Sequence, residues 1–129
     1  MLPEDRKYSK EHEWIKVEDA QAARAVMGIT DYAQDQLGDV VYFDLPKPGD
    51  PVQSQQKMGE VESVKAVSDL FSPVNGRVIE INTDLLDHPE LVNEDPFEKG
   101  WILRVTMTDA SEIDGLLSGE DYESFISGL

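Results

Sequence analysis

The stretch Glu62-Ser63-Val64-Lys65-Ala66 holds the side chain with the clearest chemical use in this chain. It places one lysine among small and apolar neighbours, in a strand-like run with carboxylates on both sides. A turn signal, Pro73-Val74-Asn75-Gly76, then opens a second strand-like run. A free lysine here performs no obvious reaction, whereas a lysine that carries a covalent cofactor needs an exposed and rigid mount. The alternative is a turn lysine that only keeps a strand edge soluble, and position alone favours that alternative.

The other reactive side chains form no recognisable site. The chain has no cysteine, which excludes disulfides, thiolate metal sites and cysteine nucleophiles. It has two histidines: His12 stands between two glutamates, and His88 follows Asp84 and Asp87. Neither has the i, i+4 histidine partner of a zinc site or the spacing of a calcium loop, so we expect no metal. No glycine-rich phosphate loop is present, and carboxylate pairs act as acid and base only inside a pocket that raises one pKa.

Composition describes an acidic protein that we expect to be soluble. Among 129 residues, 27 are acidic and 11 are basic, which gives a formal net charge of −16. Such a chain repels nucleic acid and anionic membranes and attracts basic protein partners, unless the charge serves solubility alone. No apolar run approaches the roughly 20 residues of a membrane span. The first residues resemble neither a secretory signal nor a transit peptide, so we expect a cytoplasmic location.

Hydrophobic periodicity predicts a mostly β chain with short helices. Thr30 is a predicted N-cap for a helix over 31–37 that Gly38 closes, and a helical turn is expected at 83–87. Ser111 and Ser118 are predicted N-caps of two short C-terminal helices. The predicted strands span residues 14–17, 23–29, 40–45, 58–64, 66–71, 78–81 and 101–107.

A faint repeat hints at how these strands are arranged. Gly38-Asp39-Val40-Val41 is echoed by Gly76-Arg77-Val78-Ile79, and each copy precedes a proline-containing break. Two half-units of three or four strands could therefore close over one another as a flattened sandwich or barrel. We expect one domain over 1–129, with a core at about 12–108 and a helical tail at about 109–129.

Several blocks, in order along nearly the whole chain, resemble the glycine cleavage system H protein family. The lipoylation motif of that family matches Glu62-Ser63-Val64-Lys65-Ala66. The remaining matching blocks are His12-Glu13-Trp14, Gly28 to Asp39, Ser72 to Gly76, Asn93 to Pro96 and Gly100-Trp101. The resemblance implies a barrel-sandwich hybrid of the kind found in lipoyl and biotinyl carriers. The segment 18–26 is about three residues longer than the family pattern, which predicts a longer first hairpin turn.

The resemblance also implies a function. Lys65 would carry lipoic acid in an amide bond, and the protein would be a carrier and not an enzyme. It would take the aminomethyl group of glycine from a pyridoxal-phosphate-dependent glycine decarboxylase to a tetrahydrofolate-dependent aminomethyltransferase. A dihydrolipoamide dehydrogenase would then reoxidise it.

Further residues are implied to serve the arm and its attachment. Glu62 and Gly76 match positions that a lipoate-attaching enzyme reads. Glu13 and Asp69 match positions of a cleft that shields the loaded arm, where a carboxylate could hold the amine. Tyr32 lies where several relatives have histidine, so this wall of the cleft is expected to differ.

Two other classes of protein stay open at this point. Lipoyl domains of 2-oxo acid dehydrogenases and biotin carriers use similar hairpins. Biotin carriers are expected to show Met-Lys-Met, however, and this chain has Val64-Lys65-Ala66. The tail and the His12-Glu13-Trp14 block also exceed a bare lipoyl domain. The third class is an acidic adaptor that binds partners without carrying any group.

Overall fold

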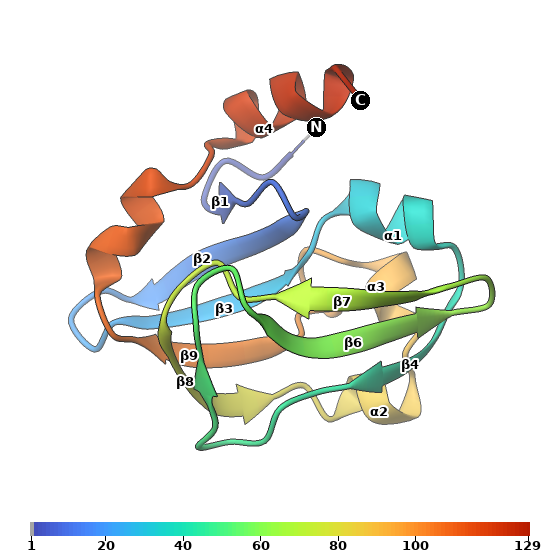
Figure 1. Cartoon of the computed structure of the whole chain (residues 1–129), viewed down its shortest axis with the longest axis horizontal. Coiled ribbons are helices and arrows are strands. Elements are labelled where there is room, and N and C mark those ends of the chain that lie inside the picture. The colour runs from blue at the N-terminus through green and yellow to red at the C-terminus, as the bar shows by residue number, and fades with distance from the viewer. Residues whose placement is uncertain (1) are drawn as a thin grey trace.

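Two antiparallel sheets form the body of the protein, which a computed structural model describes over residues 2–129. The larger sheet has six strands in the order β1-β2-β3-β9-β8-β5, and the smaller has three in the order β4-β6-β7 (Figure 1). The strands of the larger sheet are β1 Lys7–Tyr8, β2 Glu13–Asp19, β3 Arg24–Ile29, β9 Leu103–Met107, β8 Gly76–Ile81 and β5 Pro51–Val52. The smaller sheet contains β4 Val40–Asp44, β6 Lys57–Ser63 and β7 Val67–Phe71.

The sheets enclose one apolar core. Its fully buried members come from both sheets and from the crossing segments, and include Phe43, Val61, Leu70, Leu85, Leu103 and Val105. Buried and exposed residues alternate at the end of β6, since Val61 and Ser63 are buried whereas Glu62 is exposed. This pattern is the one expected of a sheet with one wet face, and the predicted β class is confirmed.

Helices close the ends of the sandwich. Helix α1 spans Asp31–Leu37, and the Thr30 side chain caps it by accepting a hydrogen bond from the Ala33 N–H, as predicted. Gly38 closes it at φ 78°, a left-handed conformation that glycine adopts without a steric penalty. The short helices α2 Asp84–Asp87 and α3 Leu91–Glu94 follow β8, of which only α2 had a sequence signal.

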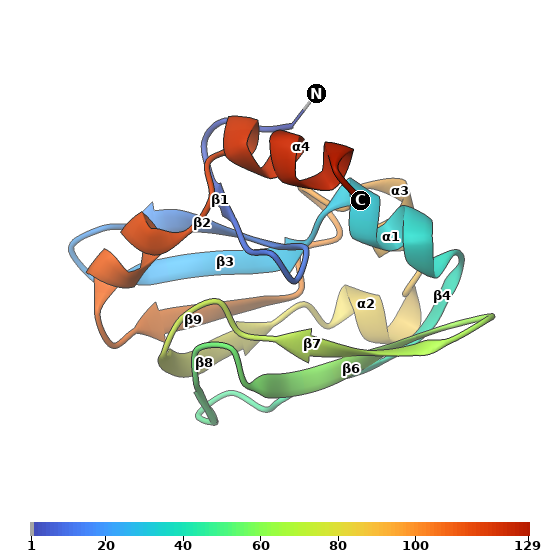
Figure 2. The same ribbon diagram turned by 45° about the horizontal axis from the view of Figure 1, so that its top comes forward.

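The C-terminal segment covers the outside of the larger sheet. A 3-10 helix, η1 Ala110–Gly115, precedes helix α4 Gly119–Ser127. Ser118 caps α4 as predicted, but the predicted cap Ser111 is wrong, because the Asp109 side chain accepts the Ser111 N–H and starts the turn two residues earlier. Figure 2 shows α4 lying over β1. There Tyr122 stacks on Tyr8 with ring centroids 5.0 Å apart, in a second apolar cluster with Trp14 and Val26.

The sequence repeat does not divide the fold into equal halves. Its first copy leads into β4 of the smaller sheet, and its second forms β8 of the larger one. The sheets have three and six strands. The short strands β1 and β5 were not predicted, because two residues are too few to show an alternating pattern.

Candidate functional site

Lys65 lies at the tip of the hairpin formed by β6 and β7, which projects from one edge of the molecule (Figure 1). The last paired residues are Glu62 and Val67, and the Ser63 N–H donates to the Ala66 carbonyl at 2.8 Å. The buried Ser63 hydroxyl accepts the Ala66 N–H at 3.1 Å and the Lys65 N–H at 3.3 Å. A serine that satisfies two turn N–H groups in this way replaces the Asn-Gly signal that the sequence lacks.

The tip is also tied to the body of the protein. The Val64 N–H donates to the Asp39 carbonyl at 3.0 Å, which joins the tip to the start of β4. The aliphatic part of the Lys65 side chain passes close to Gly38. The backbone at the lysine is therefore held by hydrogen bonds to the hairpin and to the start of β4.

The Lys65 side chain itself is exposed, and its amine has no ion pair or hydrogen bond with residues 2–129. An amine with this access can be acylated without breaking any contact of the fold. Lipoic acid in amide linkage fits the position, since the chain offers a free amine on a rigid backbone. Forming the amide would not disturb any residue of the core.

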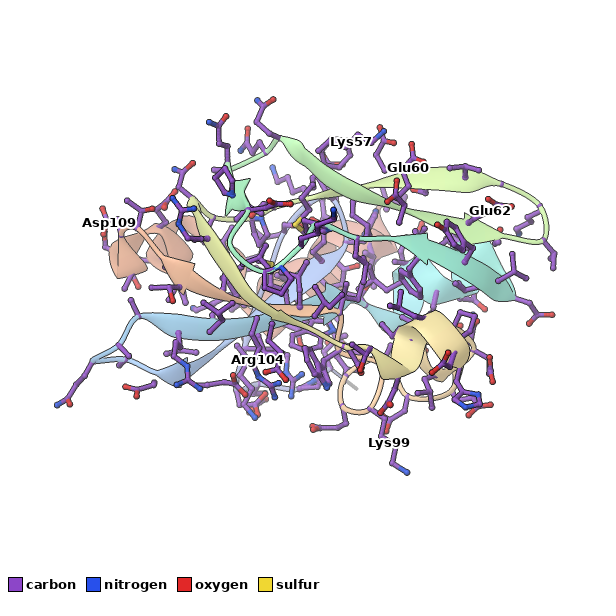
Figure 3. All side chains as sticks on the ribbon, turned by 90° about the horizontal axis from the view of Figure 1, so that it is seen from below. Lys57, Glu60, Glu62, Lys99, Arg104 and Asp109 are labelled. Carbon is purple, nitrogen blue, oxygen red and sulfur yellow. The ribbon has the colours of Figure 1, made fainter. Side chains whose placement is uncertain are left out.

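The two expected attachment residues lie in different places. Glu62 faces solvent two residues before the turn, between Tyr42 and Val67 on the paired strands. Figure 3 shows Lys57, Glu60 and Glu62 in succession along β6 toward the tip. Gly76 lies in the other sheet, paired with Val52 and Met107. A side chain there would collide with the Thr106 carbonyl, so the structure gives this glycine a packing reason.

The three expected cleft residues do come together. A cleft of about 400 Å³ runs beside β7, and Glu13, Tyr32 and Asp69 all line it. Ala66, next to the lysine, is also part of its wall, as are Ala33 and Leu37 of α1. The cleft therefore begins next to the hairpin tip. A long arm attached to Lys65 would start at the mouth of this cleft.

Glu13 is the buried carboxyl group of this cleft, with 3% of its surface exposed. Its Oε1 accepts the Ser9 hydroxyl at 2.8 Å, and its Oε2 accepts the Phe71 N–H at 3.2 Å. Burial outweighs these hydrogen bonds and raises the pKa of Glu13 to about 8. At neutral pH the group is therefore mainly the neutral acid.

Asp69 and Tyr32 form other parts of the wall. Asp69 is exposed and pairs with Lys57 at 3.4 Å, a salt bridge in which Glu60 also takes part. Tyr32 packs against His12, with ring centroids 4.7 Å apart. From the sequence, His12 was considered as a metal ligand and as part of a family block, but not as part of the cleft. Its own ring lines the cleft and bonds to Tyr122 from α4, which no spacing in the sequence could have revealed.

The described part of the chain shows neither a cluster of metal ligands nor a membrane-spanning helix. No group of three or more potential ligands among His, Cys, Asp and Glu is placed to hold a metal ion. In residues 2–129, no helix has both the length and the apolar character to cross a membrane.

A family model described as "Glycine cleavage H-protein" matches residues 6–128. The chain belongs to the glycine cleavage H-protein family. It is 49% identical over 126 residues to the glycine cleavage system H protein of Carboxydothermus hydrogenoformans, which covers 98% of this chain and 95% of the relative. It is 52% identical over 125 residues to that of Oceanobacillus iheyensis, covering 97% of each.

The solved structures agree. The crystal structure of a glycine cleavage system H protein from Mycobacterium marinum superimposes with a TM-score of 0.87 at 37% identity. The match covers 99% of this chain and 100% of that one. The barrel-sandwich hybrid fold is confirmed, and the biotin-carrier and 2-oxo acid dehydrogenase alternatives are set aside.

Membership of the family identifies the class of function. Members carry a lipoyl-lysine and are carriers that are not themselves enzymes. The chain is accordingly a component of the glycine cleavage system, with its P, T and L proteins. These are the decarboxylase, aminomethyltransferase and dihydrolipoamide dehydrogenase expected above.

Proposed function

We propose that Lys65 is the residue of this chain that carries the lipoyl group. In this assignment the aminomethyl group of glycine travels on Lys65 from the decarboxylase to the aminomethyltransferase. One observation carries the proposal: the Lys65 amine is exposed and unpaired among the described residues, on a tightly hydrogen-bonded tip beside an acid-lined cleft. When bound, the dithiolane supplies the redox and transfer chemistry.

The hairpin contributes position. Amide formation removes the positive charge of Lys65 and leaves a long tether on a fixed anchor. A tether on a rigid anchor raises the local concentration of its end at a docked partner. We assign Glu62 and Gly76 to recognition by the lipoate-attaching enzyme, Glu62 by contact near the tip and Gly76 through the strand packing that it allows.

The cleft contributes protection. We assign Glu13 and Asp69 as the groups that meet the cationic amine at the end of the loaded arm, with Tyr32 as a wall. Glu13 suits this role because its carboxyl group is buried and hydrogen bonded on both oxygens. A cation that enters beside it favours the carboxylate form, so the arrival of the amine would release a proton from Glu13.

Two further assignments accompany this proposal. We take the whole of 1–129 to act as one carrier domain, with α4 as part of it. The similarity to bacterial relatives supports placing the protein in the bacterial cytoplasm, which fractionation of cells that express the chain would test.

Intact-mass measurement tests the lysine assignment. Protein produced with a lipoate-attaching enzyme and lipoate should gain one lipoyl group, and peptide sequencing should map it to Lys65. Lys65→Arg keeps the charge and the exposed position, so it should fold normally, gain no mass and carry no aminomethyl group. An adduct on Lys57 or on any other lysine in the parent protein would refute the assignment.

A further inference from the structure

The last helix meets the cleft residue His12 through the Tyr122 hydroxyl group, in addition to ring contacts of Tyr122 and Phe125. Tyr122 of α4 is fully buried, and its Oη lies 2.8 Å from His12 Nδ1 and 2.8 Å from Thr30 Oγ1. His12 precedes β2, and Thr30 caps α1. One atom of the C-terminal helix therefore joins a residue of the cleft, His12, to the cap of the helix α1, at positions 110 and 92 residues away in the sequence.

Counting protons gives this network a direction. Thr30 Oγ1 already accepts the Ala33 N–H at 3.2 Å, and the Tyr122 oxygen is its remaining partner in the described residues. A buried hydroxyl proton without an acceptor is costly, so the Thr30 proton points to Tyr122. The Tyr122 hydroxyl then donates its hydrogen bond to His12 Nδ1, which must be unprotonated to accept it. The neutral ring of His12 consequently carries its proton on Nε2.

Other observations agree with a neutral and fixed His12. Burial lowers the pKa of His12 below its ordinary value. The residue has φ 68°, an uncommon conformation for a side chain of this size. Two backbone hydrogen bonds hold it there: its N–H donates to Ser9 at 3.1 Å, and its carbonyl accepts the Thr30 N–H at 3.0 Å. Such strain persists where surrounding contacts fix it, often at functional sites.

The Nε2–H of His12 is free to serve a ligand. It has no hydrogen-bond partner in residues 2–129, yet no buried side-chain nitrogen or oxygen there lacks one, so Nε2 reaches solvent. His12 lines the same cleft as Glu13 and Asp69. The neutral imidazole thus adds a hydrogen-bond donor to a cleft whose carboxyl groups come from Glu11, Glu13 and Asp69.

We propose that Tyr122 is a positioning residue of the arm cleft, which fixes His12 as the Nε2–H tautomer so that it donates to an acceptor on the arm. Suitable acceptors are the sulfur and the amide carbonyl of the lipoyl group. This inference rests on the proposed function of Lys65, and it makes helix α4 part of the cleft and not only a cover for the sheet.

Nitrogen NMR of the unmodified protein tests the first half without any arm. The chain has only two histidines, and His88 has an exposed side chain that serves as an internal reference. Wild-type His12 should show the Nε2–H pattern with a bare Nδ1. Tyr122→Phe should lose that preference, whereas Tyr8→Phe should keep it. Tyr8 is a matched control, since it is equally buried in the same ring stack but donates to the Pro3 carbonyl.

The spectrum can overturn the inference even if a variant fails to fold, because a wild-type His12 with its proton on Nδ1 contradicts it directly. An unchanged tautomer in folded Tyr122→Phe does the same. These readouts do not involve Lys65, so they stand apart from any failure of lipoylation.

Stability of the loaded arm tests the second half. The reduced, lipoylated protein can be loaded with formaldehyde and ammonia, and water then releases both again from the aminomethyl thioether. Loss of the group should be about fivefold faster in Tyr122→Phe, the effect of one hydrogen bond of ordinary net strength. Tyr8→Phe should match the parent. Equal rates in all three proteins would show that His12 does not serve the arm.

Discussion

Glu13 has hydrogen-bond partners that suit both of its protonation states. As a carboxylate it accepts from the Ser9 hydroxyl and from the Phe71 N–H. As an acid it can donate to Ser9, whose hydroxyl also accepts the Glu13 N–H at 3.2 Å. The residue can therefore change charge within the cleft without leaving a buried polar atom unpaired. That property suits a site visited in turn by a cationic and a neutral arm.

The raised pKa of Glu13 makes the stability of the protein depend on pH. Since the pKa of Glu13 is about 8 in the folded state and ordinarily 4.5, the folded state binds the extra proton between these pH values. Stability from this group is thus present below about pH 4.5 and falls as the pH rises toward 8. Glu13→Gln keeps the shape and cannot titrate.

Urea unfolding from pH 5 to pH 8 measures this effect. The free energy of unfolding of the parent, relative to Glu13→Gln, should fall by about 2 to 4 kcal/mol over that range. Glu62→Gln, at an exposed site, is the control and should leave the parent's pH profile intact. Parallel profiles for the parent and Glu13→Gln would contradict a raised pKa.

For single residues, the sequence is informative where neighbours along the chain form a motif. The prediction of Lys65 as the attachment site rests on the contiguous pattern Glu62 to Ala66, and the structure places this lysine on an exposed turn. The partner of His12 could not be predicted, because Tyr122 lies 110 residues away and meets it through tertiary packing. Ser63 was passed over as a small neighbour of the lysine, although its hydroxyl closes the turn.

Among the elements, the hairpin is followed in sequence by β8, a strand of the other sheet. Strand β8 packs tightly against β9, and the Gly76 backbone approaches the Thr106 carbonyl too closely for any side chain. Phe71 ends β7 just before this strand begins. A change at Gly76 can therefore disturb the sheet that supports the hairpin without touching its tip.

Gly76→Ala should lower the free energy of unfolding by about 2 kcal/mol, the usual effect of an overpacked interior site. Gly115→Ala is the matched control, since no atom lies within 4 Å of the added methyl group, and its stability should stay within about 0.5 kcal/mol of the parent. Urea unfolding measures both. A Gly76→Ala protein as stable as the parent would show that the close contact relaxes at no cost.

The same variants separate two ways in which an attaching enzyme could depend on Gly76. If the glycine acts through packing, lipoylation of Gly76→Ala should recover when low temperature restores the folded state. If the enzyme contacts Gly76 itself, the initial rate of adduct formation should stay low in fully folded protein.

Element prediction succeeded where local signals were complete. Thr30 and Gly38 bound α1 as expected, because an N-cap and a left-handed glycine determine the ends of a helix locally. The pairing of β3 with β9 and of β5 with β8 could not be predicted. Both join segments far apart in the sequence, and no residue in either strand specifies its neighbour.

For the molecule as a whole, the excess of acidic groups is largely unpaired. Ion pairs in residues 2–129 use seven of the 27 acidic side chains, which are Asp5, Glu18, Glu60, Asp69, Glu80, Glu90 and Glu98. Asp39 and Glu62 lie exposed close to the tip that carries Lys65. Their field attracts partners with basic surfaces toward the lysine, and the same charges repel one another within the folded protein.

Salt should therefore act on stability and on docking in opposite directions. Between about 0.01 M and 1 M NaCl the screening length falls from about 30 Å to about 3 Å, shorter than most distances between surface charges. Screening weakens the self-repulsion, so the thermal midpoint of the isolated protein should rise. It also weakens long-range attraction, so the rate of association with the glycine decarboxylase should fall, about tenfold or more if steering dominates. In Asp87→Asn/Glu94→Gln, which removes two exposed charges of α2 and α3 that take part in none of the ion pairs in residues 2–129, the rise of the midpoint should be smaller. A midpoint that falls with salt in both proteins would mean that favourable ion pairs, such as those of Arg104 with Glu18 and Glu80, outweigh the repulsion.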